Sequence, residues 1–260
     1  MSRSFSISIV GAGNLASNLA PELENAGHII NSISSLHLSS AQKLADSLYN
    51  TRAIDDNDFS EEDTEIIILA VKDDLITDLL GEIKTPAGAS LVHTSGFVPL
   101  DALEHFDGPY GVFYPLQSFS KGRKVDFKQV PICIESYDEA LNDKLMKLGK
   151  SISREVNFIS SSERKVIHIA AVFANNFVNH LLNISGGILK DANINPELLK
   201  PLVEETVKKA YEIGPENSQT GPAKRGDMNT IQKHLMQLAE YPEIAQLYEQ
   251  ISKQIIKDNF

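Results

Sequence analysis

The sequence has one cysteine, no tryptophan and fewer basic than acidic side chains. The single thiol, Cys133, excludes an internal disulfide and a thiolate metal cluster, and we expect no metal site. With 24 Lys and Arg against 35 Asp and Glu, the net charge of −11 argues against nucleic acid and membranes as partners. No stretch reaches the roughly 18 uncharged apolar residues that a membrane helix requires.

These shortages are typical of an ordinary soluble protein. Cys133 lies in the apolar stretch VPICIE, which predicts a buried and unreactive thiol. Acidic residues crowd the stretch from Asp55 to Glu65, which we interpret as a solvated loop. The sequence reaches the β-rich stretch SFSISIVGAG without a basic and then apolar leader, so we expect a cytoplasmic protein.

Strand-like and helical patterns alternate in the first part of the chain. Strands are expected at 5–10, 28–34, 65–71 and 89–95, and in YGVFY, VPICIE and ISREV. Helices are expected at 14–26, at 40–48 with Ser39 or Ser40 as its cap, at 74–83 and at 138–150. This alternation predicts parallel βαβ units. We therefore predict an α/β Rossmann-like parallel sheet domain over residues 1–156.

Only helical patterns follow, which predicts an all-α domain over residues 157–260. Helices are expected at 162–189, from Asn195 to Gly214, at 229–238 and at 244–257. The first of them should end near Gly186 and Gly187 or a little beyond. It is apolar almost all round, so we expect it to be buried in a two-fold homodimer.

The segment IVGAGNLA carries a glycine pattern for dinucleotide binding between a strand and a helix. Gly11 permits a tight turn, Gly13 leaves room for a pyrophosphate, and Ala16 lets the helix pack close to the sheet. The start of the helix, at Asn14 and Leu15, offers free N–H groups to phosphate. A glycine-rich turn without a ligand is the alternative.

The choice of cofactor is set about 20 residues further on, at the end of the second strand. Ser34, Ser35 and His37 lie there, and no acidic side chain is present to hold the ribose of NAD. Because hydroxyls can bond a 2′-phosphate, the pattern favours NADP. The arginine often found in NADP enzymes is missing, unless Arg52 replaces it from the neighbouring strand.

Two further strand ends point to the crevice where open α/β sheets bind ligands. The candidate cofactor contacts at these ends are Val71, Lys72, His93 and Thr94. Ser95 follows directly and is a candidate contact for substrate or nicotinamide. A hydrogen-bonded, half-buried histidine is the alternative interpretation of His93.

A polar stripe runs along the expected long helix. His168, Asn175, Asn179 and Asn183 fall within about 80° of one another at 100° per residue. Buried polar groups need partners, so the stripe either bonds to neighbouring helices or a partner chain, or faces the nicotinamide. In the second case His168 is the candidate proton donor and Asn176, beside the stripe, a substrate or nicotinamide contact.

The loop TGPAKRGD separates two expected helices. Asp227 can cap the helix that follows, but capping needs no guanidinium. The guanidinium of Arg225 presents several donors in a fork, which suits a carboxylate or phosphate. We therefore expect Arg225 to bind the acid group of a substrate across the dimer, with Thr220 contributing a hydroxyl. A surface ion pair of Arg225 with Asp227 or Glu216 is the alternative.

Six segments together resemble a known family: GAGNLA, ILAVKDD, HTSGFVPLDAL, YGVFYPLQSF, HIAAVFANNF and TGPAKRGD. The family is oxidoreductase-like, with a Rossmann-like N-terminal domain and a C-terminal helical domain of unknown function 2520. It is similar to pyrroline-5-carboxylate reductase, to the 6-phosphogluconate and 3-hydroxyisobutyrate dehydrogenases, and to deazaflavin-dependent NADP reductases. The resemblance implies NADP binding and a dimer through the helical domain.

The hydroxyacid dehydrogenases carry a catalytic lysine one helical turn before an asparagine. If Asn176 matches that asparagine, Val172 stands at the lysine position and cannot transfer a proton. Imine reduction needs less from the protein. The expected function is therefore an NADP-dependent oxidoreductase that moves hydride to or from a small polar, anionic substrate between the two domains. A non-catalytic NADP(H) sensor or an interaction protein on the same fold is the alternative.

Overall fold

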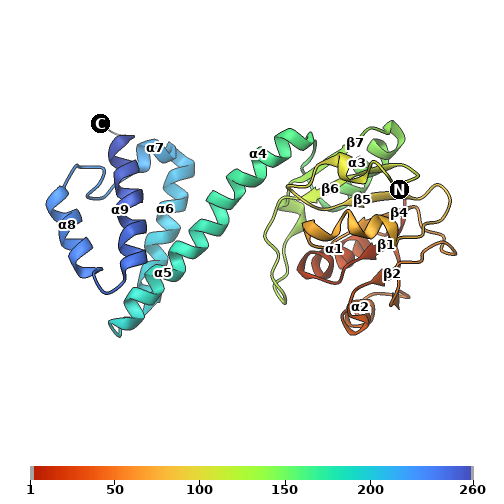
Figure 1. The fold of residues 1–260 in the computed structure, drawn as a ribbon, viewed down its shortest axis with the longest axis horizontal. Helices are drawn as coiled ribbons and strands as arrows, with labels where there is room; N and C mark the ends of the chain where they lie inside the picture. Colours follow the sequence, from red (N-terminus) through yellow and green to blue (C-terminus); the bar gives the residue numbers. More distant parts are fainter. Residues whose placement is uncertain (1–2, 259–260) are drawn as a thin grey trace. The chain divides into compact units, whose positions relative to one another are not determined.

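The structure is a computed structural model that describes residues 3–258, and it divides into two compact units that meet between Asn175 and Asn176. The first unit contains an eight-stranded sheet in the order β3-β2-β1-β4-β5-β6-β7-β8 (Figure 1). The strands are β1 (Ser6–Val10), β2 (Ile29–Ser34), β3 (Arg52–Ile54), β4 (Ile66–Leu69), β5 (Ser90–His93), β6 (Tyr110–Pro115), β7 (Ile132–Ser136) and β8 (Val156–Phe158). The Rossmann-like fold class predicted from the sequence is thus confirmed.

Both faces of the sheet are covered, as the apolar sequence of β4 predicts. Alternate residues of a strand point to opposite faces, and Ile66 and Ile68 join one buried cluster while Ile67 and Leu69 join the other. The first cluster is covered by three helices: α1 (Asn14–Asn25), α2 (Leu38–Ala45) and α3 (Glu139–Ile152). Cys133 of β7 is buried in this unit, and burial raises the pKa of its thiol, as expected for an unreactive cysteine.

The second face lacks the helix predicted at 74–83. Two short 3-10 helices stand there instead, η1 (Asp73–Leu75) and η2 (Asp78–Gly81), followed by a third after β5, η3 (Leu100–Leu103). A helical segment of this length is marginal in water, so packing decides its form. Ile76 and Leu79 reach the buried cluster from these short turns.

Other expected boundaries also differ. The helix predicted to be capped by Ser39 or Ser40 begins at Leu38, with His37 at the N-cap position and no side-chain cap bond. The stretch ISREV is not a strand until Val156, because Ile152 is buried as the last residue of α3. Strand β7 is antiparallel to β6, whereas the other neighbouring strands are parallel. A parallel pair needs a crossover, and only the short η4 (Phe127–Gln129) lies between β6 and β7.

One acidic side chain of the expected solvated loop is buried beneath the sheet. The hydroxyls of Ser8 and Ser32, which are register partners on β1 and β2, donate to Oε2 of Glu62 at 2.7 and 2.9 Å. Arg52 pairs with Oε1 of the same carboxylate at 2.8 Å. The side chain of Glu62 is only 5% exposed, so its carboxylate belongs to the interior and not to the solvated part of the loop.

The remaining described chain is helical. It comprises α4 (Ser161–Ala171), the π-helical η5 (Val172–Phe177), α5 (Val178–Asp191), η6 (Pro196–Leu199), α6 (Lys200–Ile213), α7 (Pro215–Ser218), α8 (Met228–Gln237) and α9 (Pro242–Lys257). The expected cap at Asn195 is confirmed, since its side chain accepts from the N–H of Glu197, and α6 ends at Gly214 as predicted. Gly186 and Gly187 lie inside α5, which ends at Asp191, a little beyond them, as the second of the two expected ends predicts.

The long helix predicted at 162–189 is one uninterrupted helical run through α4, η5 and α5 (Figure 1). Its apolar side chains are not buried in the single chain. Exposed members include Val166, Ile169, Val178, Leu181, Leu182 and Ile188. Within the described residues, no helix is long and apolar enough to span a bilayer.

Candidate functional site

The turn between β1 and α1 has the geometry that its glycines predict. Gly11 adopts φ 108° and donates its N–H to the carbonyl of Ser34 at 2.7 Å. A Cβ at this position would lie 2.3 Å from the carbonyl oxygen of Ala70. Gly11 is therefore required both by its backbone angle and by the close approach of the strand beside it.

Gly13 is the N-cap of α1, and its surroundings are open. A Cβ built on Gly13 would meet no atom within 4 Å, and no side chain caps the helix. The first turn holds no acidic residue, and Asn14 is exposed while Leu15 packs against the core. An uncapped helix start beside open space suits the pyrophosphate of a dinucleotide, so the residues present fit that group.

The end of β2 is less open than the sequence suggests. The hydroxyl of Ser34 is buried and donates to Oδ1 of Asn57, whereas Ser35 is half-buried and His37 exposed. Arg52 lies beside Ser32, two residues before the end of the strand, and is paired with Glu62. Ser35 is thus the better placed of the two serines to meet a 2′-phosphate.

The ends of β4 and β5 lie beside the glycine turn. Val71 approaches Gly11, with its Cγ1 3.2 Å from where a Cβ would lie, and Lys72 is exposed. Thr94 donates its hydroxyl to the carbonyl of Leu69 at 3.0 Å. These contacts bind the two strand ends into one edge of the sheet.

His93 has no exposed surface, which differs from the half-buried state considered for it. Its Nδ1 accepts the N–H of Ser95 at 3.2 Å. Burial, and secondarily the charge of Arg164, lowers the pKa of His93 to about 3. Its ring is therefore neutral and supports the loop that follows β5.

The hydroxyl of Ser95 is also engaged within its loop. It accepts the N–H groups of Phe97 and Val98 at 3.0 and 2.9 Å, and the residue is buried. This arrangement shapes the turn that carries Gly96 and Phe97. Ser95 could therefore contact a ligand only by donating its hydroxyl hydrogen.

His168 lies against this turn and against Tyr114 of β6. The Tyr114 hydroxyl is 3.4 Å from Nδ1 of His168, and the two rings meet edge to face with centroids 6.3 Å apart. The ring of Phe97 is 6.4 Å from that of His168. A Cβ on Gly96 would lie 2.6 Å from Nδ1, so only glycine lets the imidazole approach the turn.

Tyr114 remains a neutral phenol in this site. Burial raises the pKa of Tyr114 to about 12, with smaller contributions from Cys133 and Asp73. The phenolic hydrogen is therefore present at neutral pH. Close by, the ammonium of Lys165 lies over the ring of Phe97, 5.7 Å from its centroid.

A buried ion pair fixes α4, and with it His168, to the sheet. Arg164 donates from Nε to the carbonyl of Ser95 at 3.2 Å and from Nη2 to that of Val98 at 2.6 Å. Its Nη1 pairs with Glu135 of β7, whose carboxylate also accepts the N–H and hydroxyl of Ser161 at 2.7 Å each. Since Arg164 and His168 are four residues apart, they occupy the same face of α4.

The next candidate is Asn176, which borders the polar stripe. Asn176 lies in η5 and is exposed, as are Asn175, Asn179 and Asn183 of the polar stripe. In the single chain these amides therefore need no buried partner. The structural alternative, bonding to neighbouring helices, is not seen among the described residues for this stripe.

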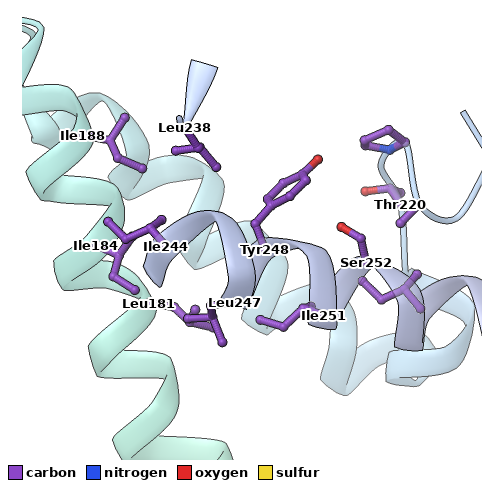
Figure 2. Close-up of a pocket in the computed structure, with 13 residues that line it drawn as sticks. Leu181, Ile184, Ile188, Thr220, Leu238, Ile244, Leu247, Tyr248, Ile251 and Ser252 are labelled. Carbon is purple, nitrogen blue, oxygen red and sulfur yellow. The ribbon is translucent and has the colours of Figure 1, made fainter. Parts of the chain in front are cut away.

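The TGPAKRGD loop borders a cavity of about 270 Å³ inside the second unit. Figure 2 shows aliphatic side chains of α5 and α9 around it, with Thr220, Tyr248 and Ser252 bringing hydroxyls. Arg225 is exposed and does not line this cavity. Among the described residues no ion pair joins Arg225 to an acidic side chain, so the surface pair considered above is not formed.

Asp227 has the capping role expected for it. One carboxylate oxygen accepts the N–H of Thr230 at 3.1 Å and the other accepts its hydroxyl at 2.7 Å. These bonds, and the nearby charge of Arg225, lower the pKa of Asp227. The loop is thus anchored to α8 at its end.

Sequence reasoning missed four residues of the His168 cluster: Phe97, Tyr114, Arg164 and Lys165. Two of them lie in segments that carry the family resemblance, HTSGFVPLDAL and YGVFYPLQSF. That signal singles out the segments, but it assigns no role to the aromatic side chains within them. Only the fold brings β5, β6 and α4 to one point.

Two families match successive parts of the chain. Residues 6–95 match the family described as NADP oxidoreductase coenzyme F420-dependent, and residues 130–255 match the domain of unknown function DUF2520. A comparison with curated proteins finds no match.

Solved structures resemble the whole chain. A candidate NADP oxidoreductase from Bacteroides fragilis is 36% identical, with a TM-score of 0.91 over 98% of each chain. A 1-pyrroline-5-carboxylate reductase from Streptococcus pyogenes is 16% identical, with a TM-score of 0.64 over 98% of this chain and 99% of that chain. A reductive aminase from Aspergillus terreus, in complex with NADPH and ethyl levulinate, is 9% identical, with a TM-score of 0.69 over 98% and 95%.

The last two likenesses concern the fold alone, whereas the first extends to the sequence. The two matched families meet in the order that the sequence resemblance predicts, Rossmann domain first and helical domain second. The chain therefore belongs to the family of Rossmann-fold NADP oxidoreductases that carry the DUF2520 domain at their C-terminal end.

Proposed function

We propose that the protein is an NADP-dependent oxidoreductase acting on a small polar, anionic substrate that carries a C=N or C=O group when oxidised. The observation that carries this proposal is the imidazole of His168, held against the turn after β5 by Gly96 and Tyr114. The end of β5 is the edge of the sheet at which open α/β folds bind their ligands.

The cofactor would be held by residues of the first unit. The N–H groups at the start of α1, above the open space at Gly13, would bind the pyrophosphate. Ser35, with Ser34 behind it, would meet the 2′-phosphate, and Val71, Lys72 and Thr94 would border the nucleotide. When bound, the nicotinamide supplies or accepts the hydride.

The protein's own chemistry would be the transfer of one proton. In the direction of reduction, hydride reaches the substrate carbon and His168 gives a proton to the nitrogen or oxygen bonded to it. Imine reduction is favoured if Asn176 matches the asparagine of the hydroxyacid dehydrogenases, because Val172 then stands at the position of their catalytic lysine. Lys165, beside Phe97, is a cation near this point for an acidic substrate.

We also propose a homodimer through the helical domain. The support is the exposure of large apolar side chains along α5 and α6, which isolated soluble chains rarely leave in contact with water. They include Leu181, Leu182, Ile188, Leu202, Val207 and Tyr211. In such a dimer Arg225, Thr220 and Asn176 would contact the substrate from the second copy.

Cofactor binding and turnover test the main proposal separately. Because the chain lacks tryptophan, NADPH binding is followed by the fluorescence of the nicotinamide itself, and NADPH should bind more tightly than NADH. Turnover is followed by loss of NADPH absorbance with cyclic imino acids, with keto acids plus ammonia, and with keto acids alone. Binding without turnover on any of these would support a nucleotide sensor instead.

His168→Asn keeps a polar side chain and removes the titrating ring. It should lower kcat by about 100-fold or more, in the range of general acid catalysis, without loss of NADPH binding. His105→Asn, at an exposed loop histidine, is the matched control and should leave the rate unchanged. A rate within about tenfold of the parent would contradict the role of His168.

Sedimentation at micromolar concentration tests the dimer. Twice the mass of 28.6 kDa is expected, and a monomer would refute the proposal. Arg225→Lys keeps the charge but loses the paired donors, so it should raise KM for an acidic substrate. An unchanged KM would remove Arg225 from the site.

A further inference from the structure

We propose that Tyr114 is a positioning residue that donates its phenolic hydrogen to Nδ1 of His168 and so places the imidazole proton on Nε2. This inference rests on the proposed function, because it assigns His168 the atom through which it serves the substrate. It concerns the ligand-free protein as well, and can therefore be tested without a substrate.

The geometry defines which nitrogen is held. Nδ1 faces the Tyr114 hydroxyl at 3.4 Å, and it is also the atom that a Cβ on Gly96 would meet at 2.6 Å. Among the described residues Nε2 makes no hydrogen bond. Nδ1 is thus turned toward the protein, and Nε2 is left for a ligand. A distance of 3.4 Å is long, as catalytic hydrogen bonds often are before a ligand tightens them.

The donor in this hydrogen bond can be identified from the other partners available to the Tyr114 hydroxyl. Tyr114 is half-buried, and its hydroxyl has no other described acceptor. If Nδ1 carried the proton, the hydroxyl would accept it, and its own hydrogen would remain without a partner. Leaving such a hydrogen unbonded costs about 1–3 kcal/mol, so donation by Tyr114 is the favoured arrangement. The pKa of about 12 ensures that the phenol keeps this hydrogen at neutral pH.

Three neighbours pack around the imidazole. The ring of Phe97 is tilted to it and that of Tyr114 meets it edge to face, at centroid distances of 6.4 and 6.3 Å, and the backbone of Gly96 lies close to Nδ1. Arg164, one turn before His168, holds α4 to the same loop. The ring orientation is therefore fixed from the sheet, from the loop and from the helix.

The chemical consequence is a donor, and not a lone pair, at the ligand side of the ring. In reduction, the Nε2 proton passes to the substrate nitrogen or oxygen while the phenolic proton passes to Nδ1. One proton is delivered in total and the imidazole stays neutral. A proton from solvent then binds Nε2 while the Nδ1 proton returns to the phenolate oxygen, which restores the starting tautomer. Tyr114 acts through His168 and need not touch the substrate.

The tautomer can be read directly by nuclear magnetic resonance. In protein labelled with 15N-histidine, two-bond correlations distinguish a protonated Nε2 from a protonated Nδ1, and His168→Asn identifies the signal. The neutral ring of the parent protein is expected to carry its proton on Nε2. A predominant Nδ1–H tautomer would overturn the proposal.

Tyr114→Phe keeps the ring contact and removes the hydroxyl. The His168 signals should shift toward a mixture of tautomers, and kcat should fall by about tenfold or more with KM little changed. Tyr110→Phe, on the same strand, is the matched control and should change neither. Unaltered tautomer signals in a folded Tyr114→Phe protein would refute the role of Tyr114.

Gly96→Ala supplies an independent arm if Tyr114→Phe does not fold. The new Cβ would meet both Nδ1 of His168 at 2.6 Å and the Tyr114 hydroxyl at 2.8 Å, so it would separate the two groups while both remain, and the same loss of tautomer preference is expected. A preserved preference would count against the contact. The two proposals fail in different ways. If the His168 proton stays on Nε2 but His168→Asn remains active, the proposed function is refuted and this inference stands. If the imidazole shows no tautomer preference, this inference is refuted and the proposed function stands.

Discussion

Arg164→Met should unfold the first unit far more easily, because it breaks a buried ion pair by removing one partner. Arg164 is 1% exposed and Glu135 17% exposed, so water replaces little of what is lost. Methionine fills much of the space, but it leaves the Glu135 carboxylate without its counter-charge and the carbonyls of Ser95 and Val98 without a donor. Breaking such a pair costs about 3–5 kcal/mol.

That loss is a large share of the roughly 5–15 kcal/mol by which a domain is stable. With a urea dependence of about 2 kcal/mol per molar, the unfolding midpoint followed by far-UV circular dichroism should fall by about 2 M. Adding Glu135→Gln removes the orphaned charge, so the double variant should lose less than Arg164→Met alone. A loss of less than about 1 kcal/mol in the free energy of unfolding would show that the pair does not hold α4.

Three further changes have defined outcomes. Gly13→Asp should abolish NADPH binding, seen by nicotinamide fluorescence, while the free energy of unfolding stays within about 0.5 kcal/mol, since the site is open; retained binding would contradict the pyrophosphate site. Gly11→Ala should instead destabilise the fold by about 1–3 kcal/mol or more in urea, because φ is 108° and the new Cβ meets Ala70; a neutral effect would refute this. The pKa of His93 is about 3 when folded and about 6.5 when unfolded, so the unfolded chain binds an extra proton between these values. The free energy of unfolding should therefore decrease as the pH is lowered below about 6.5, by up to about 1.4 kcal/mol per pH unit. In urea titrations at several pH values, His93→Asn should make this decrease smaller.

The features predicted correctly are those that a short stretch of sequence determines by itself. Gly11 answers a backbone requirement of one turn, and Asn195 and Asp227 cap the helices that begin next to them. The uninterrupted apolar sequence of β4 reflects cover on both faces. For the two caps the partner atoms lie within three residues, and for Gly11 and β4 the residue types themselves record the constraint, so a short stretch of sequence contains the physical reason.

The features that were missed depend on partners far along the chain. Arg164, in the segment SSERKVIHI, reads as one charge of a helix start, yet its partner Glu135 and the loop at Ser95 are brought to it by the fold. Tyr114 and His168 are 54 residues apart and meet only when β6 and α4 are in place. The helix expected at 74–83 failed for a related reason, because tertiary packing overrides the weak preference of so short a segment.

The carboxylate of Glu62 has a consequence for how the chain finds its correct strand pairing. Ser8 and Ser32 are opposite each other on β1 and β2, and both hydroxyls converge on one oxygen of Glu62. A slip of either strand by one residue would turn its serine to the other face and strand a carboxylate and a hydroxyl in an apolar interior. Isoleucine-rich strands could pair in several registers with similar free energies. The hydrogen bonds among these three polar side chains form in one register only, so they select it.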